Sequence, residues 1–146
     1  MTGAVRELYI AEPPAVYLDR RPLVVDCSTL SGLMFQEHWQ AEAAQKISDR
    51  ALHAPYLLDA EMANVATKKH RQGLSQIADD GMAEYQAMVI ELHSIKVQDV
   101  VSLALRYQLS AYDAAYLWLA VELKAPLATF DAKLATAAKT HLASLG

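Results

Sequence analysis

Short apolar runs separate longer stretches of helical spacing along this chain. Residues 23–25 are apolar, and Val24 and Val25 are also β-branched, as expected for a buried central strand. Shorter runs at 52–54, 93–97 and 125–130 predict three further strands. Pro55 bounds the second of these runs. The strand signals are therefore spread along the chain rather than paired in hairpins.

Helical spacing fills the intervals between these strands. One face of a helix that Gly73 ends is apolar, and that face carries Leu58, Met62, Val65 and Ala66. Helices are also expected after residue 27 to about residue 50, where Ser28 or Thr29 can cap the start, and over 74–92 with a loosening at Gly81. Three more are expected over 97–109, over 110–125 and over 131–142. Helices and strands that alternate with short connections predict an α/β domain with a parallel sheet covered on both faces.

The helix expected over 110–125 has two further features. Ser110 is its expected N-cap, with Asp113 three residues later as in a capping box. Its residues are apolar on most faces, so the helix is expected to be largely buried. We read Tyr112, Tyr116 and Trp118 as core residues on this basis.

Composition is consistent with a single compact domain. The chain has 146 residues, of which 53% are apolar and 21% are charged. Prolines at 13, 14 and 22 indicate an extended N-terminal arm over 1–22, followed by the domain at 23–146. The single cysteine, Cys27, cannot form an internal disulfide, and no apolar stretch is long enough for a membrane span. We therefore expect a cytoplasmic protein that does not enter a membrane.

Four acidic residues occupy corresponding positions in the predicted fold. Asp26 and Asp131 directly follow apolar strands, and Glu61 and Asp113 lie in the first turns of helices. A parallel sheet would gather these positions along one edge. Clustered carboxylates repel one another, and a divalent cation relieves the repulsion. The arrangement predicts a metal-dependent phosphodiesterase site.

Each acid also has an ordinary structural explanation. Aspartate is favoured as an N-cap by about 1 kcal/mol, and a first-turn carboxylate complements the helix dipole by about 0.3–1 kcal/mol. Only the joint placement of all four at one edge goes beyond this. Asp59 competes with Glu61, but a helix turns by about 200° over two residues, so the two side chains point apart. We prefer Glu61 because Asn64, one turn later, can steady its carboxylate or a bound water.

Two hydroxyl residues flank the acids. Ser28 lies two residues after Asp26, and Thr129 lies two before Asp131. Each can bind a carboxylate, a water or a phosphate oxygen at the same edge, although capping explains Ser28 equally well. The net charge of −4 argues against a broad basic surface for nucleic acid. Basic residues cluster at 20–21 and 68–71, and these clusters either contact phosphate or form solvated faces.

Other chemistries have less support. The histidines show no HxxH or HExxH spacing, which argues against a zinc hydrolase site, and there is no glycine-rich phosphate loop or GxSxG elbow. Cys27 follows an apolar strand, and we interpret it as a small buried residue rather than a nucleophile.

The motifs VVDCSTL, LLDAEMANV, LSAYDAAYLWLA and LATFDAKL, in this order, resemble the PIN-domain nucleases, above all the small VapC-type toxins of bacterial toxin–antitoxin pairs. The resemblance runs from about residue 23 to 141. It implies a three-layer α/β/α PIN-like fold with a central, mostly parallel sheet. It also implies that an acidic quartet binds Mg²⁺ or Mn²⁺, and the matching residues are Asp26, Glu61, Asp113 and Asp131. Thr129 matches a hydroxyl residue beside the last acid, and Asn64 matches an asparagine after the second.

The implied activity is endoribonucleolytic cleavage by an activated water, which leaves a 5′-phosphate and a 3′-hydroxyl. Asp26 and Asp113 are the expected inner ligands, with Glu61 and Asp131 binding directly or through water. The resemblance further implies a cognate antitoxin that inserts a basic side chain among the carboxylates, and a homodimer formed through 33–35 or the arm. The alternatives are a noncatalytic PIN-like module that binds RNA or protein, and a phosphatase or nuclease acting on DNA. RNA as substrate rests on the resemblance alone, and the region after Asp131 is less basic than it can be in the family.

Overall fold

The computed structural model describes residues 7–11 and 20–145, and the fold of the second range is built on one four-stranded sheet. The strands are β1 (Arg21–Val25), β2 (Arg50–Pro55), β3 (Ile90–His93) and β4 (Leu127–Ala128). They are ordered β3-β2-β1-β4, and every neighbouring pair is parallel. The expectation of a mostly parallel sheet is confirmed, and its carboxyl ends lie at a common edge.

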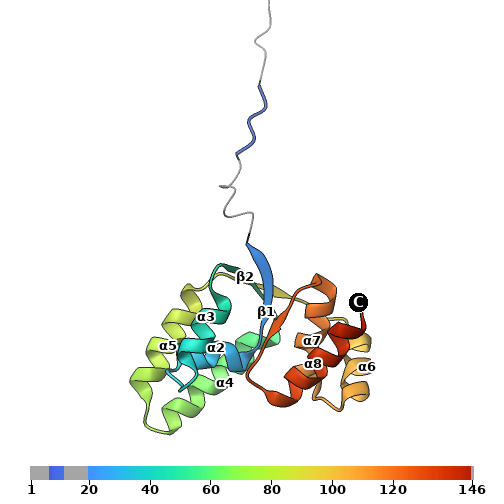
Figure 1. Ribbon diagram of the computed structural model, residues 1–146. Coiled ribbons are helices and arrows are strands. Elements are labelled where there is room, and N and C mark those ends of the chain that lie inside the picture. The colour runs from blue at the N-terminus through green and yellow to red at the C-terminus, as the bar shows by residue number, and fades with distance from the viewer. Residues whose placement is uncertain (1–6, 12–19, 146) are drawn as a thin grey trace, which may run out of the picture.

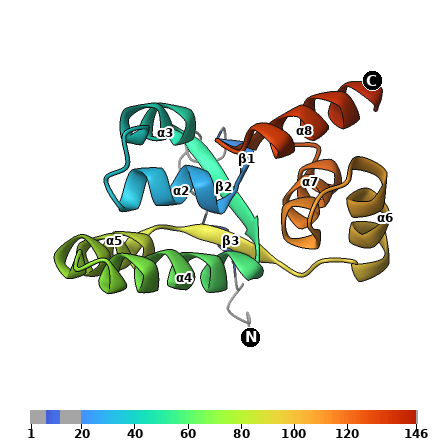
Figure 2. The same cartoon turned by 90° about the horizontal axis from the view of Figure 1, so that it is seen from below.

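The helices form two layers, one on each face of this sheet (Figure 1). One layer contains α2 (Cys27–Met34), α3 (Gln40–Ile47), α4 (Leu57–Arg71) and α5 (Ser75–Ala87). The other contains α6 (Val97–Tyr107), α7 (Ala111–Leu123) and α8 (Ala132–Ser144). Figure 2 shows β3 as the link between the two layers, because it leads from α5 to α6. The three-layer α/β/α architecture is as the sequence predicts.

Burial explains why β1 and α7 lie at the centre. Residues 23–25 of β1 are at most 4% exposed, as their apolar character predicts. In α7, every residue from 114 to 120 is buried, since the helix packs against β1, β2 and β4. Tyr116 and Trp118 are core residues as expected, but Tyr112 is 66% exposed, so its assignment to the core is wrong. It lies in the first turn of α7, on the solvent side.

Three local expectations are corrected by the structure. The third strand is Ile90–His93, earlier than the predicted 93–97, and after His93 the chain already turns toward α6. The cap of α2 is Asp26 rather than Ser28 or Thr29. Gly81 does not loosen α5, which is continuous. A Cβ at Gly81 would lie 2.5 Å from the Phe35 ring, so glycine is needed for close packing of α5 against the end of α2.

The segment 33–35 is not a free surface. Met34 and Phe35 are 4% and 2% exposed, because they pack into the core of the monomer. This segment is therefore wrong as a candidate dimer interface. The other candidate was the arm, and of its residues 1–22 those at 1–6 and 12–19 lie outside the described part of the chain. Residues 7–11 are exposed and without regular structure, and β1 already begins at Arg21.

The described residues contain no helix that is both long enough and apolar enough to cross a membrane.

Candidate active site

Asp26 lies at the carboxyl end of β1, at the start of α2. Its Oδ1 accepts hydrogen bonds from the Thr29 backbone N–H at 3.0 Å, the Thr29 hydroxyl at 3.1 Å and the Ser28 hydroxyl at 2.8 Å. The Thr129 hydroxyl donates a short hydrogen bond to the other oxygen, Oδ2. The side chain is thus both an N-cap and a group held rigidly, and the residue is only 5% exposed.

The hydroxyls of Ser28 and Thr129 join the ends of β1 and β4. Ser28 Oγ accepts from the Phe130 backbone N–H at 2.8 Å while donating to Asp26. Thr129 Oγ1 accepts from the Asp131 backbone N–H at 3.0 Å. Both residues bind a carboxylate, as the sequence suggested, and Ser28 does not cap the helix. Thr29, which the sequence reading treated only as a possible cap, also donates to Asp26, and its spacing as the third residue of α2 was the available signal.

Glu61 projects from α4 toward α7. Its Oε1 accepts a hydrogen bond of 2.6 Å from the Tyr116 hydroxyl, although Tyr116 is otherwise buried in the core. This polar role of Tyr116 was not predicted from the sequence, where Tyr116 was expected only as a core residue. Its position one turn after Asp113 on the same helix was the signal that could have revealed it.

Two neighbours of Glu61 on α4 lie elsewhere. Asp59 accepts a hydrogen bond of 2.6 Å from the Tyr85 hydroxyl, which ties α4 to α5, and it makes no side-chain cap. This supports the choice of Glu61 over Asp59. Asn64 is exposed, and within the described part of the chain its amide makes no hydrogen bond to Glu61 or to any other residue. Its predicted role in steadying the Glu61 carboxylate stays a prediction.

Asp113 and Asp131 complete the group. Asp113 is half-buried at the third position of α7, and its backbone N–H donates to the Ser110 hydroxyl at 3.1 Å, so the predicted cap is confirmed. Asp131 is exposed and caps α8 through a hydrogen bond of 2.9 Å from the Leu134 N–H to Oδ1. Both carboxylates therefore stand at the carboxyl edge of the sheet beside Asp26.

The charges of the four carboxylates act on one another, since Asp113 and Asp26 affect Glu61, and Asp131 and Asp26 affect Asp113. Burial raises the pKa of Asp26 above its ordinary value of 3.8, against the opposing effect of its hydroxyl and N–H donors. Burial raises the pKa of Glu61 as well, and the charges of Asp113 and Asp26 raise it further. The pKa of Asp113 is raised by burial and then by Asp131 and Asp26. Each of these acids is destabilised as an anion, which is the situation a bound cation relieves.

Basic side chains are few near the acids. Lys133, in the first turn of α8, is close enough to lower the pKa of Asp113. Ion pairs between described residues do not involve any of the four acids. Arg21 begins β1 at the end of the strand opposite Asp26, so it lies away from this edge.

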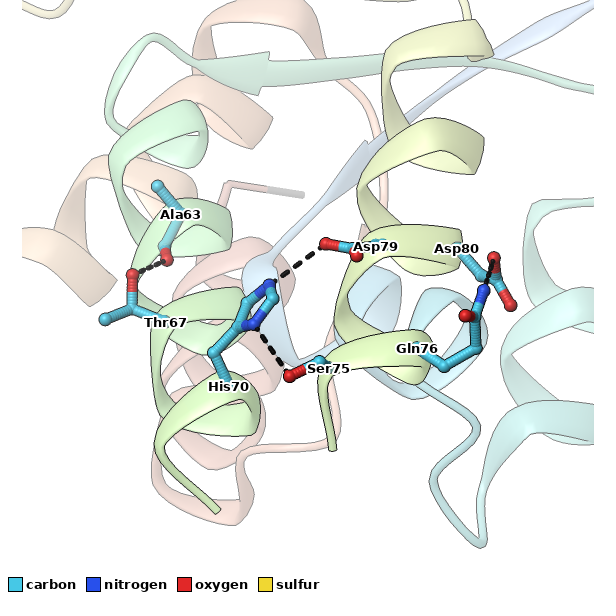
Figure 3. Close-up of polar contacts among 7 residues, drawn as sticks. All are labelled: Ala63, Thr67, His70, Ser75, Gln76, Asp79 and Asp80. Carbon is cyan, nitrogen blue, oxygen red and sulfur yellow. Dashed lines mark hydrogen bonds and ion pairs between the residues drawn. The ribbon is translucent and has the colours of Figure 1, made fainter. Parts of the chain in front are cut away.

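The basic run at 68–71 is partly engaged in holding helices together. Lys69 forms an ion pair of 2.6 Å with Glu37. His70 bridges to the next helix, with Nδ1 3.2 Å from the Ser75 hydroxyl and Nε2 3.0 Å from Asp79 (Figure 3). Lys69 thus ties α4 to the connection between α2 and α3, and His70 ties α4 to α5. Lys68 is exposed and lies two helical turns after Glu61, so it is the member that faces the site.

A surface pocket of about 500 Å³ adjoins the acids. It is lined by Ser28, His38, Trp39, Glu42, Phe130 and Asp131. Trp39 and Phe130 lie with ring centroids 5.9 Å apart, and the Trp39 indole N–H donates to the Ser28 carbonyl at 3.0 Å. Gly32 is required beneath this indole, because a Cβ there would lie 1.9 Å from Nε1. Two aromatic faces therefore stand next to an acidic edge.

Cys27 is not activated. Burial raises the pKa of its thiol to about 12, and the nearby charges of Glu61 and Asp26 act in the same direction. Its sulfur lies 3.9 Å from the Met62 sulfur, in the packing between α2 and α4. A thiol that stays protonated is a poor nucleophile, which agrees with the interpretation of Cys27 as a packed residue.

The donor set suits a hard divalent cation. All four candidate ligands are carboxylates, the class of ligand that Mg²⁺ and Mn²⁺ prefer. Within the described residues, Asp26 Oδ2 carries one hydrogen bond and Glu61 Oε2 and Asp131 Oδ2 carry none, so each keeps lone pairs for a ligand. The raised pKa values of Asp26, Glu61 and Asp113 also favour a bound cation, because the cation would stabilise their charged forms.

Comparison with known proteins identifies the class to which this fold and edge of acids belong. The PIN domain family model matches residues 23–140. The chain therefore belongs to the PIN-domain family.

Two individual proteins are similar to it. Ribonuclease VapC3 from Pyrobaculum aerophilum is 31% identical over 120 residues, which cover 77% of this chain and 92% of that protein. The crystal structure of PAE2754 from Pyrobaculum aerophilum superposes with a TM-score of 0.64 at 22% identity, over 86% of this chain and 89% of that one. The first comparison confirms the resemblance to VapC-type proteins, and the second confirms the fold.

Proposed function

We propose that this protein is a metal-dependent endoribonuclease and the toxin of a toxin–antitoxin pair. The observation that carries the proposal is the convergence of Asp26, Glu61, Asp113 and Asp131 at one edge of the sheet, with mutual repulsion and no basic ion-pair partner among the described residues. Membership of the PIN-domain family and similarity to a protein named Ribonuclease VapC3 support the reaction and the substrate.

The protein's own groups would divide the work as follows. Asp26 and Asp113 act as inner ligands, and Glu61 and Asp131 bind directly or through water. Thr29, Ser28 and Thr129 hold the Asp26 carboxylate in one orientation, and Tyr116 does the same for Glu61.

When bound, Mg²⁺ or Mn²⁺ supplies positive charge to the scissile phosphate and makes water a better nucleophile. Lys133 adds a fixed positive charge beside Asp113 that can meet a phosphate oxygen. Hydrolysis of this kind leaves a 5′-phosphate and a 3′-hydroxyl.

The decisive experiment is cleavage of a mixed pool of structured RNAs by the purified protein in Mg²⁺ or Mn²⁺. We expect discrete fragments with 5′-phosphate ends that disappear in excess chelator and return when the cation is restored. A parallel reaction with single-stranded DNA distinguishes a general nuclease from a ribonuclease. Full activity in chelator would exclude the metal-dependent mechanism, and an intact RNA pool with a folded, Mg²⁺-binding protein would favour a noncatalytic binding module.

The pocket that Trp39 and Phe130 help to line is the proposed binding place of a base next to the scissile phosphate. Single-stranded bases stack on aromatic side chains, and one such contact contributes about 1–3 kcal/mol. Replacing Phe130 by leucine keeps an apolar side chain but removes the ring face. We expect KM for RNA to rise about tenfold with little change in kcat.

The control for this prediction is a substrate that lacks the stacked base. Once the cleavage position is mapped, an abasic nucleotide beside it should be cut equally well by wild-type protein and Phe130→Leu. A variant that lowers kcat without changing KM would contradict a role in base binding.

The partners follow from the same proposal. A cognate antitoxin would cover the acids with a basic side chain, which neutralises the charges that the cation otherwise neutralises. For a homodimer, α6 offers an exposed apolar row formed by Val97, Val101 and Leu105 at four-residue spacing. The protein would act in the cytoplasm, where its RNA substrates are. Sedimentation as a monomer at micromolar concentration would contradict the dimer.

A further inference from the structure

Three metal-binding side chains meet on β2 and β3, and His93 is the last residue of β3. Nδ1 of His53 lies 2.9 Å from Nε2 of His93 and 3.5 Å from Oε2 of Glu91. The ligand atoms of all three residues lie within 4.8 Å of one another. Among the described histidines, cysteines and acids, this is the one group of three that is gathered so closely. None of its members belongs to the acidic quartet.

The register of two parallel strands creates this cluster. His53 on β2 is the partner of Glu91 on β3, and His93 follows Glu91 by two residues. Because side chains alternate along a strand, Glu91 and His93 share one face with His53. Leu52 and Leu92 alternate with them and point into the opposite layer, where they pack with the core. The three donors are therefore fixed by backbone pairing rather than by a loop.

We propose that His53, Glu91 and His93 form a binding site for a transition-metal ion, with Zn²⁺ as its reference occupant. Two imidazole nitrogens and one carboxylate oxygen suit Zn²⁺, Ni²⁺ or Cu²⁺, whereas Mg²⁺ prefers oxygen ligands alone. The site is thus chemically distinct from the quartet, whose donors are all carboxylates.

The geometry is close to what such an ion requires. Zinc binds nitrogen and oxygen at about 2.0–2.2 Å, so two ligands of one ion are at most about 4.3 Å apart. The two contacts of His53 at 2.9 and 3.5 Å already satisfy this limit. A change in the Glu91 rotamer can bring its carboxylate within the same limit of His93, because the Glu91 side chain is 68% exposed. In the metal-free protein, the facing ring nitrogens of the two histidines instead share a proton in a hydrogen bond.

A bound ion would stabilise the pairing of β2 and β3 at an exposed edge of the sheet. β3 is an edge strand of the sheet, and among the strands of the described residues it pairs with β2 alone. An ion held by one ligand from β2 and two from β3 would tie these strands together. Binding to the folded state alone raises stability by mass action. The three protein ligands leave at least one coordination position on the solvent side of Glu91 for water.

The test is a Zn²⁺ titration of chelator-stripped full-length protein in excess Mg²⁺. Excess Mg²⁺ competes with Zn²⁺ for the proposed carboxylate site but not for imidazole, so calorimetry in excess Mg²⁺ favours detection of the histidine site. We expect one Zn²⁺ per chain and a rise in Tm on binding. Co²⁺ in place of Zn²⁺ should give visible absorption bands characteristic of nitrogen and oxygen ligands in a low-symmetry site.

Variants assign the ligands. Glu91→Gln and His93→Gln should each weaken Zn²⁺ binding by more than the roughly 10–100-fold that loss of an outer-shell partner costs. Both positions are on the edge strand, and far-UV circular dichroism checks that each variant folds. His38→Gln, at an exposed histidine outside the cluster, and Asp113→Asn, within the quartet, should leave Zn²⁺ affinity unchanged.

Two results would overturn the assignment. One is the absence of Zn²⁺ binding by the wild-type protein in excess Mg²⁺. The other is binding that survives Glu91→Gln and His93→Gln but is lost in Asp113→Asn, which would place the zinc among the four carboxylates. Neither result bears on RNA cleavage in Mg²⁺, so failure of this proposal is distinguishable from failure of the proposed nuclease function.

Discussion

Replacing Asp113 by asparagine should reduce RNA cleavage by at least about 10²–10³-fold, the loss that removal of one preorganised charge-stabilising group causes. The substitution removes a negative charge and a proposed metal ligand but almost no volume. The same substitution should stabilise the metal-free protein at neutral pH, because the Asp113 anion is destabilised by burial and by Asp131 and Asp26. Activity and stability thus move in opposite directions, which a merely structural role for Asp113 would not produce.

Cleavage assays and thermal denaturation in chelator measure these two effects. Asp59→Asn is the matched control, since Asp59 is an acid of the neighbouring helix that binds Tyr85 instead of joining the cluster. It should retain near wild-type cleavage, whereas Glu61→Gln should lose it. Cleavage by Asp113→Asn at a tenth of the wild-type rate or more would remove Asp113 from the proposed chemistry.

The second large effect is a pH-dependent stabilisation by Mg²⁺ or Mn²⁺. At a cation concentration 100 times its Kd, binding to the folded state alone adds about 2.7 kcal/mol. For a chain of this size that corresponds to a rise in Tm on the order of 5–10 °C. We expect this gain at pH 7.5 and a much smaller one at pH 4.5, because protons and the cation compete for the same carboxylates.

The sign of the metal-free pH dependence follows from the raised pKa values. Asp26, Glu61 and Asp113 have pKa values raised on folding, so between the ordinary values of 3.8 and 4.5 and the raised ones the folded state binds more protons than the unfolded state. The free energy of unfolding contributed by these groups therefore falls as pH rises through that window. Burial lowers the pKa of His53 and His141 below the ordinary value of 6.5. The free energy of unfolding that these two groups contribute therefore rises as pH rises from the lowered values to 6.5.

The comparison of wild type with Asp113→Asn separates these contributions, because the histidines are the same in both proteins. The variant should show a weaker fall in stability with rising pH and a smaller gain from Mg²⁺. Differential scanning calorimetry from pH 4 to 8, with and without Mg²⁺, measures both quantities. An equal Mg²⁺ gain in the two proteins at pH 7.5 would show that the cation binds elsewhere.

The positions of the acids were accessible from sequence because local rules govern them. An aspartate between an apolar strand and a helix caps that helix, as Asp26 and Asp131 do. Parallel strands have their carboxyl ends at one edge of the sheet, so the amino-acid sequence alone predicts that the four acids lie together. The same local rules failed at Gly81, where a neighbouring helix rather than helix propensity determines the residue.

The amino-acid sequence by itself determined the class of fold, the parallel sheet and the acidic edge, because period, capping and strand ends are properties of neighbouring residues. Only the tertiary structure decided what each acid touches. The Tyr116 hydroxyl reaches Glu61 across 55 residues, and Thr129 reaches Asp26 across 103. The meeting of His53 with Glu91 and His93 depends on the register of β2 against β3. Contacts between distant segments depend on packing and strand register, which no local pattern specifies.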